Sequence, residues 1–247
     1  MLATVLLVGS LLLWWACSRW RDALSERAPV LPCTARAALL LIAHPDDECM
    51  FFAPTILGLL REQRQLHVLC FSTGNYYNQG EIRKNELIHS CTALGIPPSN
   101  VTDLPDNPNV QWNTDLLSDL ILNHIKEKKI DTVPLHTHHN ITMSIFLVEV
   151  IHAGSVFIGC GVLVLETVNV FRKYLSLLDL PGSWLYPKDV LFTVSGAQYS
   201  QAKEAMKCHQ SQLLWFRRIY LLFSRYMMIN SLALLTCEKE EKALKAS

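Results

Sequence analysis

The most constraining feature of the sequence is an alternation of short apolar runs with helix-like segments, which starts near residue 38. The apolar runs lie at 38–43, 66–72, 100–105, 130–133, 162–168 and 190–194. Helix-like patterns lie at 50–65, 81–94 and 114–129. Strands that alternate with helices favour an α/β domain built on a mostly parallel sheet with helices on both faces. We expect this domain to span residues 38–232, after a linker at 19–37 and before a polar tail at 233–247.

The N-terminus lacks charged side chains from residue 1 to residue 18, and Arg19, Arg21 and Arg27 follow. A run of this length is at the short end for a transmembrane helix, and arginines beyond it predict a cytoplasmic C-terminal side. We therefore predict a transmembrane anchor at 1–18. The alternative is a cleaved signal peptide, but no Lys or Arg precedes the apolar run as a signal peptide requires.

The overall composition excludes some classes of protein. Lys plus Arg and Asp plus Glu are equal at 22 each, whereas a general nucleic-acid-binding protein needs a basic excess. Hydrophobic residues make up 50% of the chain and the mean hydropathy is +0.20, which suggests membrane contact. The eight cysteines form no CxxC pair, so reduced thiols facing the cytosol fit better than a disulfide framework.

Two segments permit more than one interpretation. Residues 143–168 are apolar enough for a second membrane span, but the cost of an intramembrane Glu149 favours a buried helix followed by a buried strand. Residues 200–230 have a helical pattern with Arg217, Arg218 and Arg225. This segment fits either an interfacial helix on anionic lipid or a core-facing helix with solvated arginines.

A cluster of ionisable residues follows the first apolar run. The strand at 38–43 would deliver His44, Asp46 and Asp47 to the carboxyl edge of the sheet, where α/β proteins bind ligands. His and Asp side chains ligate Zn²⁺, and a second carboxylate can act as a base toward metal-bound water. The cluster lacks a third ligand. The alternative is that Asp46 or Asp47 only caps the next helix.

The stretch AHPDDECMFFAPTILGL at 43–59 resembles the signature of the zinc-dependent de-N-acetylases of the LmbE-like superfamily. CFSTGNYYNQGEIRKNEL and CHQSQLLWFRRIYLLFSRYMMINSL further resemble the branch that acts in GPI-anchor synthesis. The resemblance implies a Rossmann-like fold and a glycolipid substrate, N-acetylglucosaminyl-phosphatidylinositol, from which acetate is removed in the second step of that pathway. It also implies an endoplasmic-reticulum membrane protein with a cytosolic catalytic domain.

The resemblance also implies roles for individual residues. His44 and Asp47 would ligate zinc, or another divalent metal, and Asp46 would be the general base. Four further residues would bind the substrate, namely Asn75, Tyr76, Arg83 and Glu86.

The second motif of the family is altered in this chain. The usual glycine-rich lead-in is missing and residues 134–159 depart from the family, but HTHHN keeps the H-x-x-H spacing with His136 and His139. By position, His139 would be the third zinc ligand, and His136 would stabilise the oxyanion or protonate the leaving amine. Two alternatives stay open: a related enzyme for another amino-sugar conjugate, and a catalytically inactive, membrane-anchored binding or regulatory protein.

Overall fold

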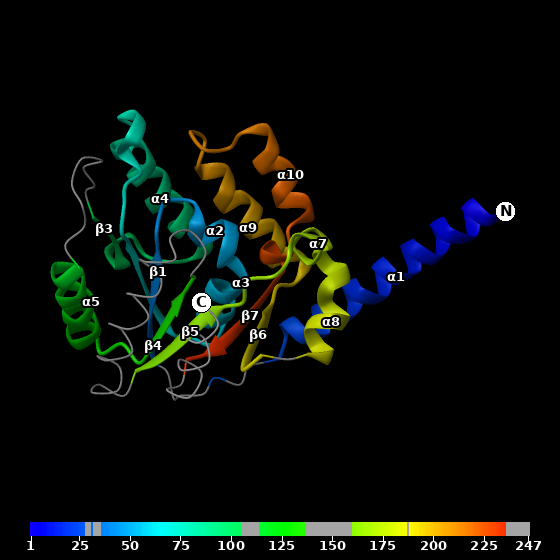
Figure 1. The fold of residues 1–247 in the computed structure, drawn as a ribbon, viewed down its shortest axis with the longest axis horizontal. Helices are drawn as coiled ribbons and strands as arrows, with labels where there is room; N and C mark the ends of the chain where they lie inside the picture. Colours follow the sequence, from blue (N-terminus) through cyan, green and yellow to red (C-terminus); the bar gives the residue numbers. More distant parts are fainter. Residues whose placement is uncertain (28–30, 32–35, 105–113, 137–159, 187, 236–247) are drawn as a thin grey trace.

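The predicted alternation of strands and helices is present in the computed structural model, which describes residues 1–27, 31, 36–104, 114–136, 160–186 and 188–235 (Figure 1). The strands are β1 (Ala37–Ile42), β2 (Gln65–Cys70), β3 (Val101–Asp103), β4 (Thr132–Leu135), β5 (Gly161–Leu165), β6 (Val190–Thr193) and β7 (Ile229–Leu234). The helices are α1 (Leu2–Ser25), α2 (Asp47–Phe51), α3 (Ala53–Arg61), α4 (Gly80–Leu94), α5 (Thr114–Lys128), α7 (Val170–Tyr174), α8 (Leu180–Leu185), α9 (Gly196–Cys208) and α10 (Trp215–Phe223). Short 3-10 turns include η1 (Asn75–Tyr77), η2 (Pro98–Asn100), η3 (Ser176–Asp179) and η4 (Arg225–Met227).

The strands of the described residues form one sheet in the order β3-β2-β1-β4-β5-β7-β6. Strands β1 to β5 pair in parallel. Between β1 and β2, the register runs from Ala37 opposite Gln65 to Ile42 opposite Cys70. This arrangement confirms the prediction of a mostly parallel α/β sheet. Strand β7 was not predicted; it runs antiparallel to both β5 and β6.

The sheet is covered on both faces, which explains why all six residues of β1 are buried. Alternate side chains of a strand point to opposite faces. Ala38, Leu40 and Ile42 therefore join one core with α2, α3, α4 and α9. Leu39 and Leu41 join a second core with α5. The apolar runs of the sequence thus result from burial on two sides.

The N-terminal helix continues past the predicted boundary at residue 18. Cys17, Arg21 and Ser25 are buried against the body, so the first part of the predicted linker is helical. The rest of α1 projects away from the body (Figure 1). Within the described part of the chain, none of the helices combines the length and the apolar character needed to cross a bilayer, and the predicted transmembrane anchor is not confirmed.

The ambiguous segment at 143–168 is described only in part. Residues 137–159 lie outside the described residues, and so does the end of the polar tail, 236–247. The remainder forms β5, whose Val162, Leu163 and Leu165 are buried. This strand agrees with the interpretation of 162–168 as a buried strand.

Candidate active site

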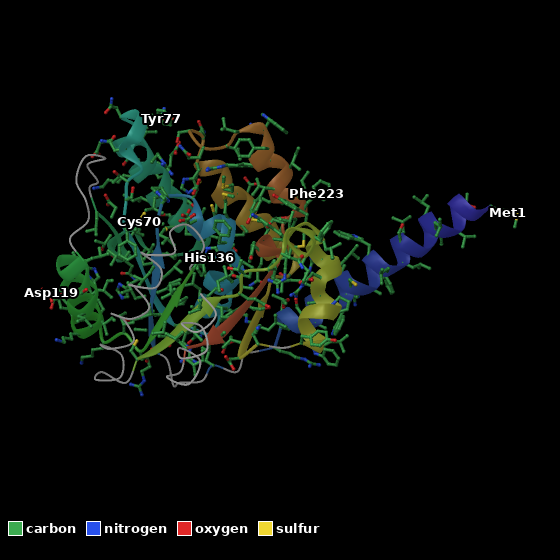
Figure 2. All side chains as sticks on the ribbon, in the orientation of Figure 1. Met1, Cys70, Tyr77, Asp119, His136 and Phe223 are labelled. Carbon is green, nitrogen blue, oxygen red and sulfur yellow. The ribbon has the colours of Figure 1, made fainter. Side chains whose placement is uncertain are left out.

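The candidate site lies where the strand order of the sheet changes direction. Strand β1 pairs with β2 on one side and with β4 on the other, and a ligand crevice forms at such a switch point outside the carboxyl ends of the strands. The His44–Asp47 turn follows β1, and His136 follows β4. Two segments far apart in the sequence thus meet at one edge of the sheet, where Figure 2 shows His136 near the centre of the molecule.

The turn after β1 is tight. Asp47 Oδ2 accepts a hydrogen bond from the His44 backbone N–H at 3.0 Å, and α2 begins at Asp47. Asp46 has a φ of 111°, a left-handed conformation that costs energy for a non-glycine residue. Its side chain makes no capping hydrogen bond to α2. The simple helix-cap interpretation therefore does not account for the Asp46 carboxylate.

The Asp46 carboxylate instead pairs with Arg217 of α10, which donates to Asp46 Oδ2. Asp46 is only 3% exposed. Burial and the nearby charge of Asp47 raise the pKa of Asp46 to about 6, and the charge of Arg217 opposes this rise. Asp46 is thus a buried carboxyl group with a perturbed pKa, which is typical of functional sites.

Asp47 and His136 line the same small cavity. Its volume is about 30 Å³, which is enough for an ordered water or an ion. The end of β1 and the aromatic rings of Phe51 and Phe52 form the other walls. The His136 ring stacks on Phe51 with 5.0 Å between ring centroids, and this contact fixes its orientation.

The donor set around the cavity is compatible with a metal ion. Removal from water raises the pKa of Asp47 to about 6, although hydrogen bonds from the backbone and the charge of Arg217 oppose this. A cation beside Asp47 would offset the cost of its half-buried charge. His44 lies on the exposed side of the turn, and His139 lies outside the described residues. Carboxylate and imidazole ligands are those that Zn²⁺ uses, so these residue types fit a zinc ion.

A second group of ionisable residues lies directly behind the turn. Glu48 Oε1 lies 2.6 Å from His209 Nε2 and accepts a hydrogen bond from Ser90 Oγ at 2.5 Å. Burial would raise the pKa of Glu48, but the charge and hydrogen bond of His209 outweigh it and lower this pKa. Cys49 lies close enough to Glu48 and His209 for these three side chains to hold a common ion. Burial, however, raises the pKa of the Cys49 thiol well above the usual range.

The Glu48–His209 pair therefore has a structural role as a buried ion pair. The carboxylate oxygens of Glu48 are already engaged, because Glu48 Oε2 also accepts from the Asp46 backbone N–H at 2.9 Å. This ion pair connects α2 to the end of α9 and stabilises the turn that carries Asp46 and Asp47. Arg217 and His209 were not predicted as site residues.

Among the residues predicted to bind substrate, Arg83 contacts the turn after β1. Arg83 donates to the carbonyl oxygens of Pro45 at 2.9 Å and Gly74 at 3.3 Å, which ties the loop after β2 to the turn after β1. Asn75 Oδ1 accepts from the Gly80 backbone N–H at 2.9 Å, at the start of α4.

Glu86 and Tyr76 complete the predicted substrate set. Both carboxylate oxygens of Glu86 accept hydrogen bonds from Ser211, at 2.8 and 2.6 Å, so this side chain is engaged within the protein. Tyr76 lies in η1, and its side chain is outside the described part of the chain. Contact of these four residues with a substrate stays a prediction.

Comparisons with known proteins agree with this geometry. Residues 39–144 match the family model PIG-L, described as GlcNAc-PI de-N-acetylase. The chain is 48% identical to N-acetylglucosaminyl-phosphatidylinositol de-N-acetylase of Bos taurus over 92% of this chain and 95% of that protein. A relative from Dictyostelium discoideum, named "Probable N-acetylglucosaminyl-phosphatidylinositol de-N-acetylase", is 32% identical over 80% of this chain and 92% of its own length.

The fold is also similar to a solved structure. The N,N'-diacetylchitobiose deacetylase from Pyrococcus horikoshii, in complex with an inhibitor, aligns with a TM-score of 0.61. The alignment covers 87% of this chain and 89% of that chain at 12% identity. At this identity the likeness concerns the fold alone.

Proposed function

Because the chain belongs to the GlcNAc-PI de-N-acetylase family, we propose that it hydrolyses the N-acetyl group of N-acetylglucosaminyl-phosphatidylinositol. The products are glucosaminyl-phosphatidylinositol and acetate, and the reaction is the second step of GPI-anchor biosynthesis. The main support is the likeness to curated relatives along nearly the whole chain. The buried Asp46 beside Asp47, at the carboxyl edge of the sheet, supports an acid–base reaction at this position.

Zinc, or another divalent metal, is part of the proposal. His44, Asp47 and His139 would hold it. When bound, the metal supplies a Lewis acid for the amide carbonyl and lowers the pKa of its water.

The protein's own groups have distinct tasks in this proposal. Asp46 accepts the proton of the attacking water, and Arg217 holds its carboxylate in place from α10. His136 shares the cavity with Asp47, a position suited to stabilising the oxyanion or to giving a proton to the leaving amine. The aromatic walls of the cavity exclude bulk water, which strengthens these interactions.

The substrate headgroup would contact Asn75, Tyr76, Arg83 and Glu86, which lie in or beside the loop after β2. A lipid substrate requires that the enzyme meet a bilayer. We place the chain at the endoplasmic-reticulum membrane, with its catalytic domain on the cytosolic side and α1 in contact with lipid. Nucleic acid has no part in this proposal.

The direct test is acetate release from N-acetylglucosaminyl-phosphatidylinositol in phosphatidylcholine vesicles by the full chain loaded with zinc. Removal of a general base costs about 10²–10⁴-fold in rate, so we expect Asp46→Asn to lose at least 10²-fold activity. Asp119→Asn, at an exposed position of α5, is the matched control and should retain full activity. A parent chain that releases no acetate would favour the inactive, regulatory alternative, for which the altered segment 134–159 is the reason.

A further inference from the structure

Large apolar side chains are exposed together on α7, α8 and α10. Phe171 is 85% exposed, Trp215 73% and Phe223 52%. We call this patch the α7–α8–α10 surface; its main members are Phe171, Trp184, Leu185, Trp215, Leu222 and Phe223. It lies on the side of the body from which α1 projects, and Figure 2 labels Phe223 there. A large exposed apolar patch of this kind marks an interaction site.

The surface is continuous across its helices. Helix α10 contacts α7, and α7 contacts η3, against which both α8 and α1 pack. Lys173 Nζ of α7 lies 5.4 Å from the ring centroid of Tyr220 on α10. At the other end, the rings of Trp20 on α1 and Trp184 on α8 lie 5.4 Å apart. The exposed side chains therefore belong to one packed unit that joins the base of α1.

The charge of these helices suits an anionic partner. The sequences VFRKY of α7 and WFRRIYLLF of α10 each contain two basic residues, and neither these two helices nor α8 (LPGSWL) contains Asp or Glu. Arg172 and Arg217 pair with buried carboxylates, whereas Arg218 is exposed and Lys173 is half-buried at the edge of the surface. Aromatic side chains beside basic residues are typical of elements that lie at the headgroup level of a membrane.

The projecting part of α1 favours lipid over a protein partner. Consecutive apolar residues at positions 5–8 and 11–15 are exposed, so this part of the helix is apolar on every side. A helix that is apolar on every side is usually buried in apolar surroundings. A bilayer supplies that environment and extends to the neighbouring α7–α8–α10 surface.

The inner side of α10 reaches the candidate active site. Arg217 pairs with Asp46, and Tyr220 Oη donates to the Met50 carbonyl of α2 at 3.1 Å. One short helix therefore carries exposed apolar residues on its outer side and a site residue on its inner side. Contact of this helix with a membrane would hold the site close to the lipid headgroups.

From these observations we infer that the α7–α8–α10 surface is a docking surface for an anionic lipid bilayer. The helices lie in the headgroup region with Trp215, Leu222 and Phe223 inserted, and Arg218 and Lys173 meet lipid phosphates. This inference deepens the proposed function, because it states how a lipid-bound headgroup reaches the site. The first of its two tests below does not depend on catalysis.

The experiment uses the full chain with an environment-sensitive fluorophore on a single cysteine. Cys33, Cys208 and Cys237 are replaced by Ser, since the remaining cysteines are buried. One protein carries the label at Phe223→Cys and the control carries it at Asp119→Cys on α5, on the opposite side of the molecule (Figure 2). Each is mixed with phosphatidylcholine vesicles that contain phosphatidylinositol and a lipid quencher located just below the headgroups.

We expect the label at position 223 to shift its emission to the blue and to be quenched, with no change at position 119. Quenching should weaken when phosphatidylinositol is omitted. Vesicle binding without quenching at position 223 would overturn the inference, because α1 alone would then hold the chain. Blue-shifted emission of the label at position 223 in the absence of lipid would also overturn the inference, since a second copy of the chain would then cover the surface.

A variant pair provides an independent measurement. Each of the two aromatic side chains removes apolar area from water when it inserts into the bilayer, and a tenfold change in affinity corresponds to about 1.4 kcal/mol. The double variant Trp215→Ser and Phe223→Ser should therefore lose at least tenfold in acetate release from vesicles, with the rate on a short-chain, water-soluble substrate unchanged. Ile82→Ser, at an exposed apolar position on α4, is the control. Equal loss on both substrates would contradict a docking role, whereas a parent inactive on both would refute only the proposed function.

Discussion

Replacement of Arg225 by Met should destabilise the fold, because this arginine is fully buried. Its guanidinium donates to Asp179 at 2.5 Å and to the hydroxyl oxygens of Ser183 and Ser231 at 2.8 and 2.6 Å. These bonds connect η4, η3, α8 and β7. The cluster thus holds the elements beneath the α7–α8–α10 surface against the edge of the sheet.

The magnitude follows from what Arg225→Met leaves behind. Met fills much of the volume but removes the charge and every donor. Breaking a buried ion pair on one side costs about 3–5 kcal/mol. Asp179 keeps two hydrogen bonds from Arg172, at 2.8 and 3.0 Å, so we expect a loss near the lower limit, about 3 kcal/mol. With a urea m-value of about 3 kcal/mol/M, the midpoint should fall by about 1 M.

The measurement is urea unfolding of the purified full chain in detergent micelles, followed by near-UV circular dichroism. Arg218→Met on α10 is the matched control, because Arg218 is exposed and surface substitutions usually change stability by no more than about 0.5 kcal/mol. Equal midpoints for the parent, Arg225→Met and Arg218→Met would refute the reasoning. The buried charge cluster around Arg225 would then contribute no more to the free energy of unfolding than the exposed Arg218 does.

Three other predictions concern stability, metal binding and packing. Burial would raise the pKa of Asp179, but hydrogen bonds from Arg172 and Ser183 and the charge of Arg225 outweigh it and lower this pKa. The contribution of Asp179 to the free energy of unfolding is therefore present above the unfolded pKa of about 3.9 and is lost as the pH falls from there through the folded pKa. The urea midpoint of the parent should accordingly drop below pH 4 more steeply than that of Asp179→Asn. His139→Ala should reduce bound zinc from about one ion per chain to little, as a site with three protein ligands predicts, measured by metal analysis after gel filtration; equal zinc in both would remove His139 from the ligand set. Gly58→Ala should lower the free energy of unfolding by about 1–3 kcal/mol, because a Cβ there would lie 2.8 Å from Cε1 of Phe192. Gly9→Ala is the control, because the space around its Cβ is open, and it should leave the urea midpoint unchanged or higher.

The central features of the fold follow from local sequence patterns. The six residues of β1 are apolar because two cores meet at that strand, and this pattern is visible without any tertiary information. The HPDD turn is also a local signal, since ionisable residues directly after a buried strand must lie at its carboxyl end. Strand β7 was harder to predict, because Ile229–Leu234 follows a helical segment directly and its partners β5 and β6 precede it in the chain.

The partners of the site residues could not be predicted in the same way. Asp46 and Arg217 are 171 residues apart in the sequence, and Glu48 and His209 are 161 apart. The resemblance of HTHHN to the family's H-x-x-H motif implied a site role for His136, and its place beside the turn after β1 depends on pairing between β1 and β4. Periodicity reports which side of a helix is apolar, but it does not report which element packs on the polar side.

The three arginines of residues 200–230 illustrate this limit most clearly. Arg218 is exposed, Arg217 reaches inward to Asp46, and Arg225 is fully buried with Asp179. Arg217 and Arg218 are adjacent, and successive positions of a helix differ in direction by about 100°, so one points to the site while the next points to solvent. Arg225 lies beyond the end of α10, where the chain turns into β7 and its side chain meets a carboxylate supplied by η3. The core-facing interpretation with solvated arginines therefore holds for Arg218 alone, and the interfacial interpretation stays a prediction, because a helix at the edge of a site can pack inward with one arginine and expose the next.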